Sequence, residues 1–172
     1  MEEYKINEHF LNAIYEIRGK VLQSCIDLEM VMDTYISEHF CETPSKVFEL
    51  ISLLLSPRVA WREKLIVFTI FIEKYNTDFL SEYPEFSKDI TNIIEHRNVF
   101  AHLPADITSN GYKLFTEKGI ASFLKFKNAK LPKTNEIVYM RSPSYTNEEI
   151  NSILKGINTY TGAIQKMLRK IK

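Results

Sequence analysis

The feature that most constrains this fold is a long helical pattern near the start of the chain. No proline occurs between Asn7 and Phe40. Apolar residues recur there every three or four positions, which is the spacing of one face of an amphipathic helix. These are Phe10, Ile14, Ile17, Val21, Cys25, Leu28, Met32 and Ile36. We therefore expect one long helix, or two helices broken near Gly19.

Proline-containing start signals predict three more helices. Thr43-Pro44 has the order of an N-cap followed by a proline in the first turn, and Ser56-Pro57 repeats it. Tyr83-Pro84 opens the third of these helices, which must end near residue 103 because the residue before Pro104 is disfavoured in the α region. The expected helices span about 45–55, 58–75 and 84–103.

The pattern changes after Pro104. Turn signals lie at 109–111 and 117–119, and short β-rich runs at 112–115, 120–127 and 136–140 predict two or three antiparallel strands. Thr146 and Glu149 then form a capping box that opens a C-terminal helix. We predict a mainly α fold: a bundle of about five helices in a single domain, 1–172, with a small β-hairpin insert at about 110–140.

Composition indicates a globular chain without a membrane span. The chain has 172 residues, of which 45% are apolar and 26% charged, as in ordinary folded domains. The longest apolar stretch, at 65–72, is far shorter than the roughly 20 residues that cross a bilayer. The acidic N-terminus lacks the apolar segment of a signal peptide.

The two cysteines favour a reducing compartment. Cys25 and Cys41 would lie ~24 Å apart on one helix, which is too far for a disulfide. We therefore expect a cytoplasmic protein.

The net charge of zero conceals an uneven distribution. Residues 1–104 carry 10 basic and 17 acidic side chains, and residues 105–172 carry 12 basic and 5 acidic ones. The second part therefore either binds an anionic partner or packs against the acidic part. The charge split alone does not distinguish nucleic acid from protein.

The segment with the most informative chemistry is 95–102, at the end of the helix before Pro104. Asn98 and His102 lie one turn apart, about 40° from each other around the helix axis. Imidazole transfers protons near neutral pH, and a helix C-terminus favours its charged form. Arg97 has the planar guanidinium that binds phosphate oxygens. A cation and a proton-transfer group can cleave RNA without a metal, because the 2′-hydroxyl supplies the nucleophile.

Arg97-Asn98-x-x-x-His102 resembles the R-N-x-x-x-H motif of the HEPN superfamily. This resemblance implies a helical, often dimeric domain and a metal-independent endoribonuclease of a toxin–antitoxin or abortive-infection system. It assigns phosphate binding to Arg97, acid–base catalysis to His102 and a supporting role to Asn98. The two protomers would share one composite site, with a 2′,3′-cyclic phosphate as product. No cofactor or metal is implied, and an antitoxin protein is a possible partner.

One position departs from that family. HEPN toxins that are neutralised by nucleotidyltransferase antitoxins often carry tyrosine two residues after the histidine, where this chain has Pro104. Control by nucleotidylation of that tyrosine is therefore not expected here.

Three further residues are candidates for supporting roles. Glu29 lies on the apolar stripe of the first helix, where an acid usually has a cation partner; it either supports Arg97 or lies in water at the edge of the stripe. Lys125 and Lys127 lie among aromatic residues, a pattern that can bind single-stranded RNA. The same alternation also fits a strand with lysines in water and aromatics in the core.

The sequence leaves three hypotheses for function. The first is a homodimeric, metal-independent endoribonuclease. The second is a non-catalytic HEPN-like module that binds RNA or nucleotides, and the third is a helical protein–protein adaptor. RNA cleavage that persists in a chelator would favour the first, and an RNA complex without cleavage would favour the second.

Overall fold

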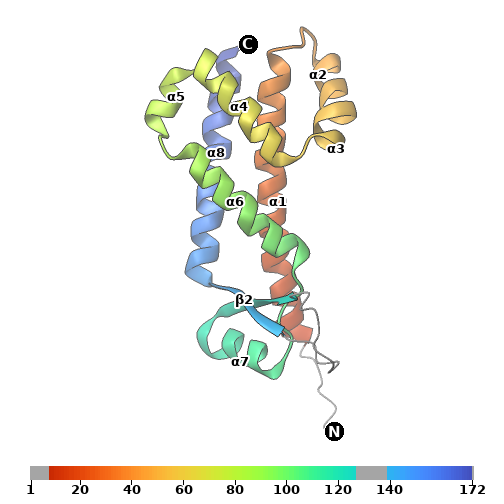
Figure 1. The fold of residues 1–172 in the computed structure, drawn as a ribbon, viewed down its shortest axis with the longest axis vertical. Helices are drawn as coiled ribbons and strands as arrows, with labels where there is room; N and C mark the ends of the chain where they lie inside the picture. The colour runs from red at the N-terminus through yellow and green to blue at the C-terminus, as the bar shows by residue number, and fades with distance from the viewer. Residues whose placement is uncertain (1–7, 127–138, 172) are drawn as a thin grey trace, which may run out of the picture. The chain divides into compact units, whose positions relative to one another are not determined.

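The computed structural model describes residues 8–126 and 139–171. It confirms a mainly helical fold with a small antiparallel hairpin before the C-terminal helix (Figure 1). The elements are α1 (Glu8–Glu38), α2 (Pro44–Leu50), the π-helical turn η1 (Ile51–Leu55), α3 (Ser56–Arg58), α4 (Trp61–Tyr75), α5 (Thr77–Glu82), α6 (Phe86–His102), α7 (Ser109–Lys118), β1 (Ile120–Phe126), β2 (Tyr139–Thr146) and α8 (Asn147–Ile171). None of the helices in these two ranges is both long and apolar enough to cross a membrane.

The helix boundaries follow the local signals of the sequence. The first segment is one helix, α1, because exposed Gly19 lies within it without a break. Thr43 is the N-cap of α2 and accepts a hydrogen bond from the Lys46 amide at 3.5 Å. The helix expected over 58–75 begins only at Trp61, because Val59 has an extended conformation that separates α3 from α4.

The contacts divide the chain into two compact units, which we describe separately. The first unit comprises Met1–Leu22 and Arg97–Ile153, and the second comprises Gln23–His96 and Leu154–Lys172. The expectation of a single domain over 1–172 stays a prediction.

The core of the second unit is rich in aromatic residues. Phe68 and Phe86 are fully buried with ring centroids 5.6 Å apart. Tyr35 meets the edge of Phe68 at 5.2 Å, and Tyr160 of α8 meets Phe86 at 5.2 Å. Edge-on and tilted ring pairs of this kind stabilise a core beyond the burial of their area.

The first unit corrects one secondary-structure prediction. Residues 112–115 were expected to form a strand, but they lie in the helix α7. The Thr108 side chain caps its start by accepting a hydrogen bond from the Gly111 amide, and Gly119 ends it with a left-handed φ of 62°. The two apparent turn signals are therefore the two caps of one helix.

The hairpin of the first unit joins β1 and β2 as antiparallel neighbours. The third expected run, 136–140, overlaps the start of β2, and its residues 136–138 lie outside the described ranges. The capping box is confirmed: the Glu149 amide donates to Thr146 Oγ1 at 3.2 Å, and the Thr146 amide donates to Glu149 Oε2 at 2.7 Å.

Candidate functional site

The candidate site lies at the C-terminal end of α6, within the first unit. His102 is the last residue of the helix, and the Leu103 amide closes the final turn by donating to the Val99 carbonyl at 3.0 Å. The helix stops there because Pro104 follows within two residues. His102 and Asn98 are exposed and Arg97 is half-buried. The last two turns of α6 therefore present all three side chains of the motif where a substrate can reach them.

Asn98 orients the guanidinium of Arg97. Arg97 Nη1 donates a hydrogen bond to Asn98 Oδ1 at 3.2 Å. The amide oxygen is neutral, so this contact directs the guanidinium without cancelling its charge. Arg97 forms no ion pair among the residues that the structure describes. Its positive charge stays available for an anion such as a phosphate.

The segment that follows His102 is attached to the hairpin. The Leu124 amide donates to the Pro104 carbonyl at 2.8 Å, and the Asp106 amide donates to the Ser122 carbonyl at 2.9 Å. Between these bonds, Ala105 forms an antiparallel bridge with Phe123. The chain after α6 thus runs beside β1, which fixes the end of the helix on a folded support.

An aromatic cluster lies between the end of α6 and the hairpin. Phe100 is fully buried, one turn from Arg97, and its ring centroid is 5.0 Å from those of both Phe123 and Tyr145. The rings join the last turns of α6 to both strands of the hairpin. The rigid packing holds the backbone that carries Arg97 and His102.

Arg18 of α1 is a residue of this site that the motif does not reveal. Its Nη2 donates to the Leu103 carbonyl at 2.6 Å, and its guanidinium carbon lies 5.7 Å from the centroid of the Phe123 ring. Its Nε is buried and has no hydrogen-bond partner within the described ranges. Arg18 therefore satisfies a free carbonyl at the end of α6, immediately after His102.

The sequence does contain a signal for Arg18. It lies four residues after Ile14 and three before Val21, and both of these are buried. A cation between two buried positions of one helix face needs a polar partner. That spacing predicts a contact for Arg18, but the sequence does not identify Leu103 as its partner.

Glu29 has a different partner from the one considered in the sequence. In the second unit, Lys64 Nζ donates to Glu29 Oε1 at 2.6 Å and to Asp33 Oδ2 at 2.8 Å. The Lys64 side chain is fully buried. Burial raises the pKa of Asp33 and the contact with Lys64 opposes that rise. Glu29 is half-buried and belongs to an ion cluster around the buried Lys64, and a supporting role beside Arg97 has no contact in its favour.

Of the two basic candidates on the hairpin, Lys125 lies among the described residues and Lys127 does not. Lys125 is exposed on β1, where its Cα pairs with that of Met140. An exposed lysine on this strand is available for a phosphate contact, as well as for water.

No group of three or more His, Cys, Asp or Glu side chains in 8–126 and 139–171 is placed to hold a metal ion. Comparisons with known proteins give no match of the chain to a protein-family model, to a curated protein or to a solved structure.

Proposed function

We propose that the chain is a metal-independent endoribonuclease of HEPN type, which acts as a homodimer in a toxin or phage-defence system of the cytoplasm. The observation that supports this best is the exposed end of α6. His102 closes the helix there, and Arg97 is oriented by Asn98 while keeping its charge. A proton-transfer group and a cation are the groups that RNA cleavage by the 2′-hydroxyl requires.

The reaction is an internal transfer at phosphorus. The 2′-oxygen forms a bond to phosphorus as the bond from phosphorus to the 5′-oxygen breaks. The neutral imidazole of one His102 takes the 2′-hydroxyl proton, and the protonated imidazole of the second protomer gives a proton to the departing 5′-oxygen. Arg97 compensates the charge that develops on the phosphoryl oxygens. The products are a 2′,3′-cyclic phosphate and a 5′-hydroxyl.

An exposed apolar groove on the second unit supports the proposed dimer. The groove has a volume of about 480 Å³, and Ile66 and Ile70 of α4 line it with more than half of each side chain exposed. Ser87 and Thr91 of α6 complete its wall. Contiguous exposed apolar surface commonly marks a protein interface. A second copy bound here would contact the same helix that carries Arg97 and His102.

The test is an RNA cleavage assay with purified protein in excess EDTA. We expect cleavage to persist, with products that end in a 2′,3′-cyclic phosphate. A phosphomonoesterase removes a simple 3′-phosphate directly, but it removes the cyclic end only after acid has opened the ring. Sedimentation at micromolar concentration should give twice the mass of the chain. Full activity of a strict monomer would contradict the shared site.

The exposed groove also favours a second candidate function. A helical adaptor would use Ile66 and Ile70 to bind another protein and would need no chemistry at the end of α6. Protein that neither cleaves nor shifts RNA in electrophoresis would favour this adaptor. A shift without cleavage would favour a non-catalytic module that binds RNA or nucleotides.

A further inference from the structure

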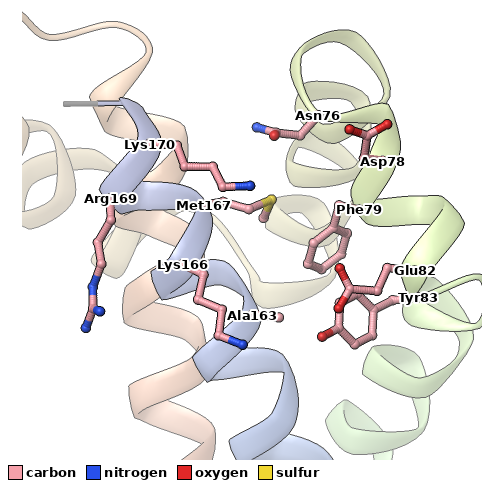
Figure 2. A pocket seen from close by; sticks show the side chains of 10 residues that line it. All are labelled: Asn76, Asp78, Phe79, Glu82, Tyr83, Ala163, Lys166, Met167, Arg169 and Lys170. Atoms are coloured by element: carbon pink, nitrogen blue, oxygen red, sulfur yellow. The ribbon is translucent and has the colours of Figure 1, made fainter.

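A second site of different chemistry lies between α5 and the end of α8, within the second unit. The two elements enclose a pocket of about 370 Å³. This volume is near the lower end of the range of small-molecule sites, about 300–1,000 Å³. The residues that line it are Asn76, Asp78, Phe79, Glu82, Tyr83, Ala163, Lys166, Met167, Arg169 and Lys170 (Figure 2).

The two walls of the pocket carry opposite charges. Lys166 and Lys170 lie one turn apart on α8, and Figure 2 shows both side chains extending toward α5. Asp78 and Glu82 lie one turn apart on α5 and form the facing wall. Each wall therefore presents a pair of like charges four residues apart along a helix.

The opposite charges do not neutralise each other across the pocket. In the described part of the chain, none of the ion pairs within 4.0 Å joins the two walls. Like charges one turn apart on a helix repel each other mildly, so each pair is stabilised by a counter-charge. The gap between the walls leaves room for a ligand to supply both counter-charges at once.

The floor of the pocket is apolar. Phe79, Ala163 and Met167 are all buried, with exposed fractions of 5–6%. Asn76 at one end is held by its hydrogen bond to the Tyr35 hydroxyl at 2.6 Å. A hydrogen bond to the Glu82 carboxylate raises the pKa of Tyr83, and the same bond holds the Glu82 carboxylate beside the Tyr83 hydroxyl at the edge of the pocket. The pocket thus combines an apolar floor with polar groups at fixed positions.

We propose that this pocket binds a small zwitterion: an amino acid or short peptide with a free amino group and a free carboxylate. The carboxylate lies against Lys166 and Lys170, the ammonium group lies against Asp78 and Glu82, and an apolar side chain covers the floor. A purely anionic ligand would face the two carboxylates of α5. A purely cationic ligand would face the two ammonium groups of α8. Only a ligand with both charges meets both walls favourably.

The experiment uses the full-length protein labelled with ¹⁵N and three dipeptides. The probes are alanylphenylalanine with free ends, its N-acetyl form and its C-terminal amide. We expect the free dipeptide to shift the amide signals of α5 and of the last turns of α8. Each blocked form should bind about tenfold more weakly, which is the usual effect of losing a hydrogen bond to a charged group.

Two double variants separate the walls. Lys166→Gln with Lys170→Gln should remove the preference for a free carboxylate and leave the preference for a free amine. Asp78→Asn with Glu82→Gln should do the reverse. Lys155→Gln is the matched control, because it removes an exposed positive charge from the same helix at a position that does not line the pocket. It should leave all three affinities unchanged.

Two results would overturn the proposal. The first is equal binding of the free and blocked dipeptides. The second is the absence of signal changes in α5 and α8 at millimolar dipeptide. Neither result depends on RNA cleavage, so failure of this site is distinct from failure of the proposed nuclease.

Discussion

Lys64 and Arg97 are both cations on helices with apolar faces, but the chain surrounds them differently. The Lys64 side chain is fully buried between two carboxylates, at 2.6 Å from Glu29 and 2.8 Å from Asp33. Arg97 is half-buried and contacts the neutral amide of Asn98 at 3.2 Å. One positive charge is matched by carboxylates, and the other has no ion pair among the described residues.

This is the difference expected between a charge that stabilises the fold and a charge that binds a ligand. A buried lysine with two carboxylates cannot bind a phosphate without losing partners that its burial requires. An arginine directed by an amide keeps both its charge and its planar array of donors. Variants of the two cations should therefore affect different measurements, stability for Lys64 and cleavage for Arg97 and its neighbour His102.

The largest effect is expected from His102→Ala. Loss of a group that transfers protons in the transition state typically lowers a rate by about 10²–10⁴-fold. His102 is exposed, so its removal should leave the melting temperature and the dimer unchanged. The measurement is the single-turnover cleavage rate, with melting and sedimentation as controls. A rate equal to that of the wild type would show that His102 is not a catalytic residue.

Lys64→Met should have the largest effect on stability. Removal of one partner from a buried ion cluster leaves uncompensated charge and costs about 3–5 kcal/mol. Urea unfolding measures this as a lower midpoint at constant slope. Replacing all three residues with apolar ones of similar volume, Glu29→Met, Asp33→Leu and Lys64→Met, should recover most of the loss. A triple variant as unstable as the single one would mean that lost packing, and not lost charge balance, causes the effect.

The pH dependence of that loss gives a second check. Burial raises the pKa of Asp33, so the folded protein binds more protons than the unfolded chain and this residue's contribution to stability falls as pH rises. Without Lys64, whose contact lowers this pKa, the fall in stability should extend to higher pH and become larger in total. The destabilisation by Lys64→Met should thus be greater at about pH 7 than at about pH 4, where carboxylates protonate. Equal losses at both values would exclude Asp33 and Glu29 as the cause.

Arg97→Ala should lower the cleavage rate and leave stability nearly unchanged, which is the opposite of the effect of Lys64→Met. Loss of one electrostatic contact to the transition state typically lowers a rate by about 10²–10³-fold. The melting temperature should change little, because no carboxylate among the described residues loses a partner. Arg97→Lys keeps the charge without the planar donors, so its cleavage rate should lie between those of the wild type and of Arg97→Ala. A large fall in melting temperature with normal cleavage would place Arg97 with Lys64 as a structural cation.

Arg18→Ala should act on the end of α6 rather than on the reaction itself. Hydrogen bonds to charged groups contribute about 1.5–3 kcal/mol, so the bond to the Leu103 carbonyl stabilises the last turn. We expect faster hydrogen exchange at the Leu103 amide, which closes that turn, together with a fall in kcat larger than the rise in KM. Arg18→Lys should restore part of both. Unchanged exchange at Leu103 would show that the contact does not hold the helix end.

The sequence predicts the fold better than it predicts which residues the charged side chains contact. The α1 stripe, the stop at Pro104 and the Thr146–Glu149 capping box are local signals, and each appears as expected. The segment 112–115 was predicted to be a strand because the sequences around Gly111 and Gly119 have the composition of turns. In the structure they lie at the two ends of the helix α7. The motif places Arg97 and His102 at the end of one helix because they are close in sequence. Lys64 pairs with a residue 35 positions away and Arg18 with one 85 away, and no local pattern specifies such partners.

The smallest effect is expected from Lys125→Ala on the hairpin. Each phosphate contact contributes roughly one to the slope of log affinity against log salt, so the slope for RNA binding should fall by about one. Adding Lys127→Ala should lower it again by a similar amount. Lys46→Ala is the matched control, because it removes an exposed charge from α2. The measurement is the affinity of His102→Ala protein for a short RNA at several salt concentrations, which keeps the RNA intact. An equal change for Lys46 and Lys125 would mean that overall charge, and not the hairpin, attracts RNA to the protein.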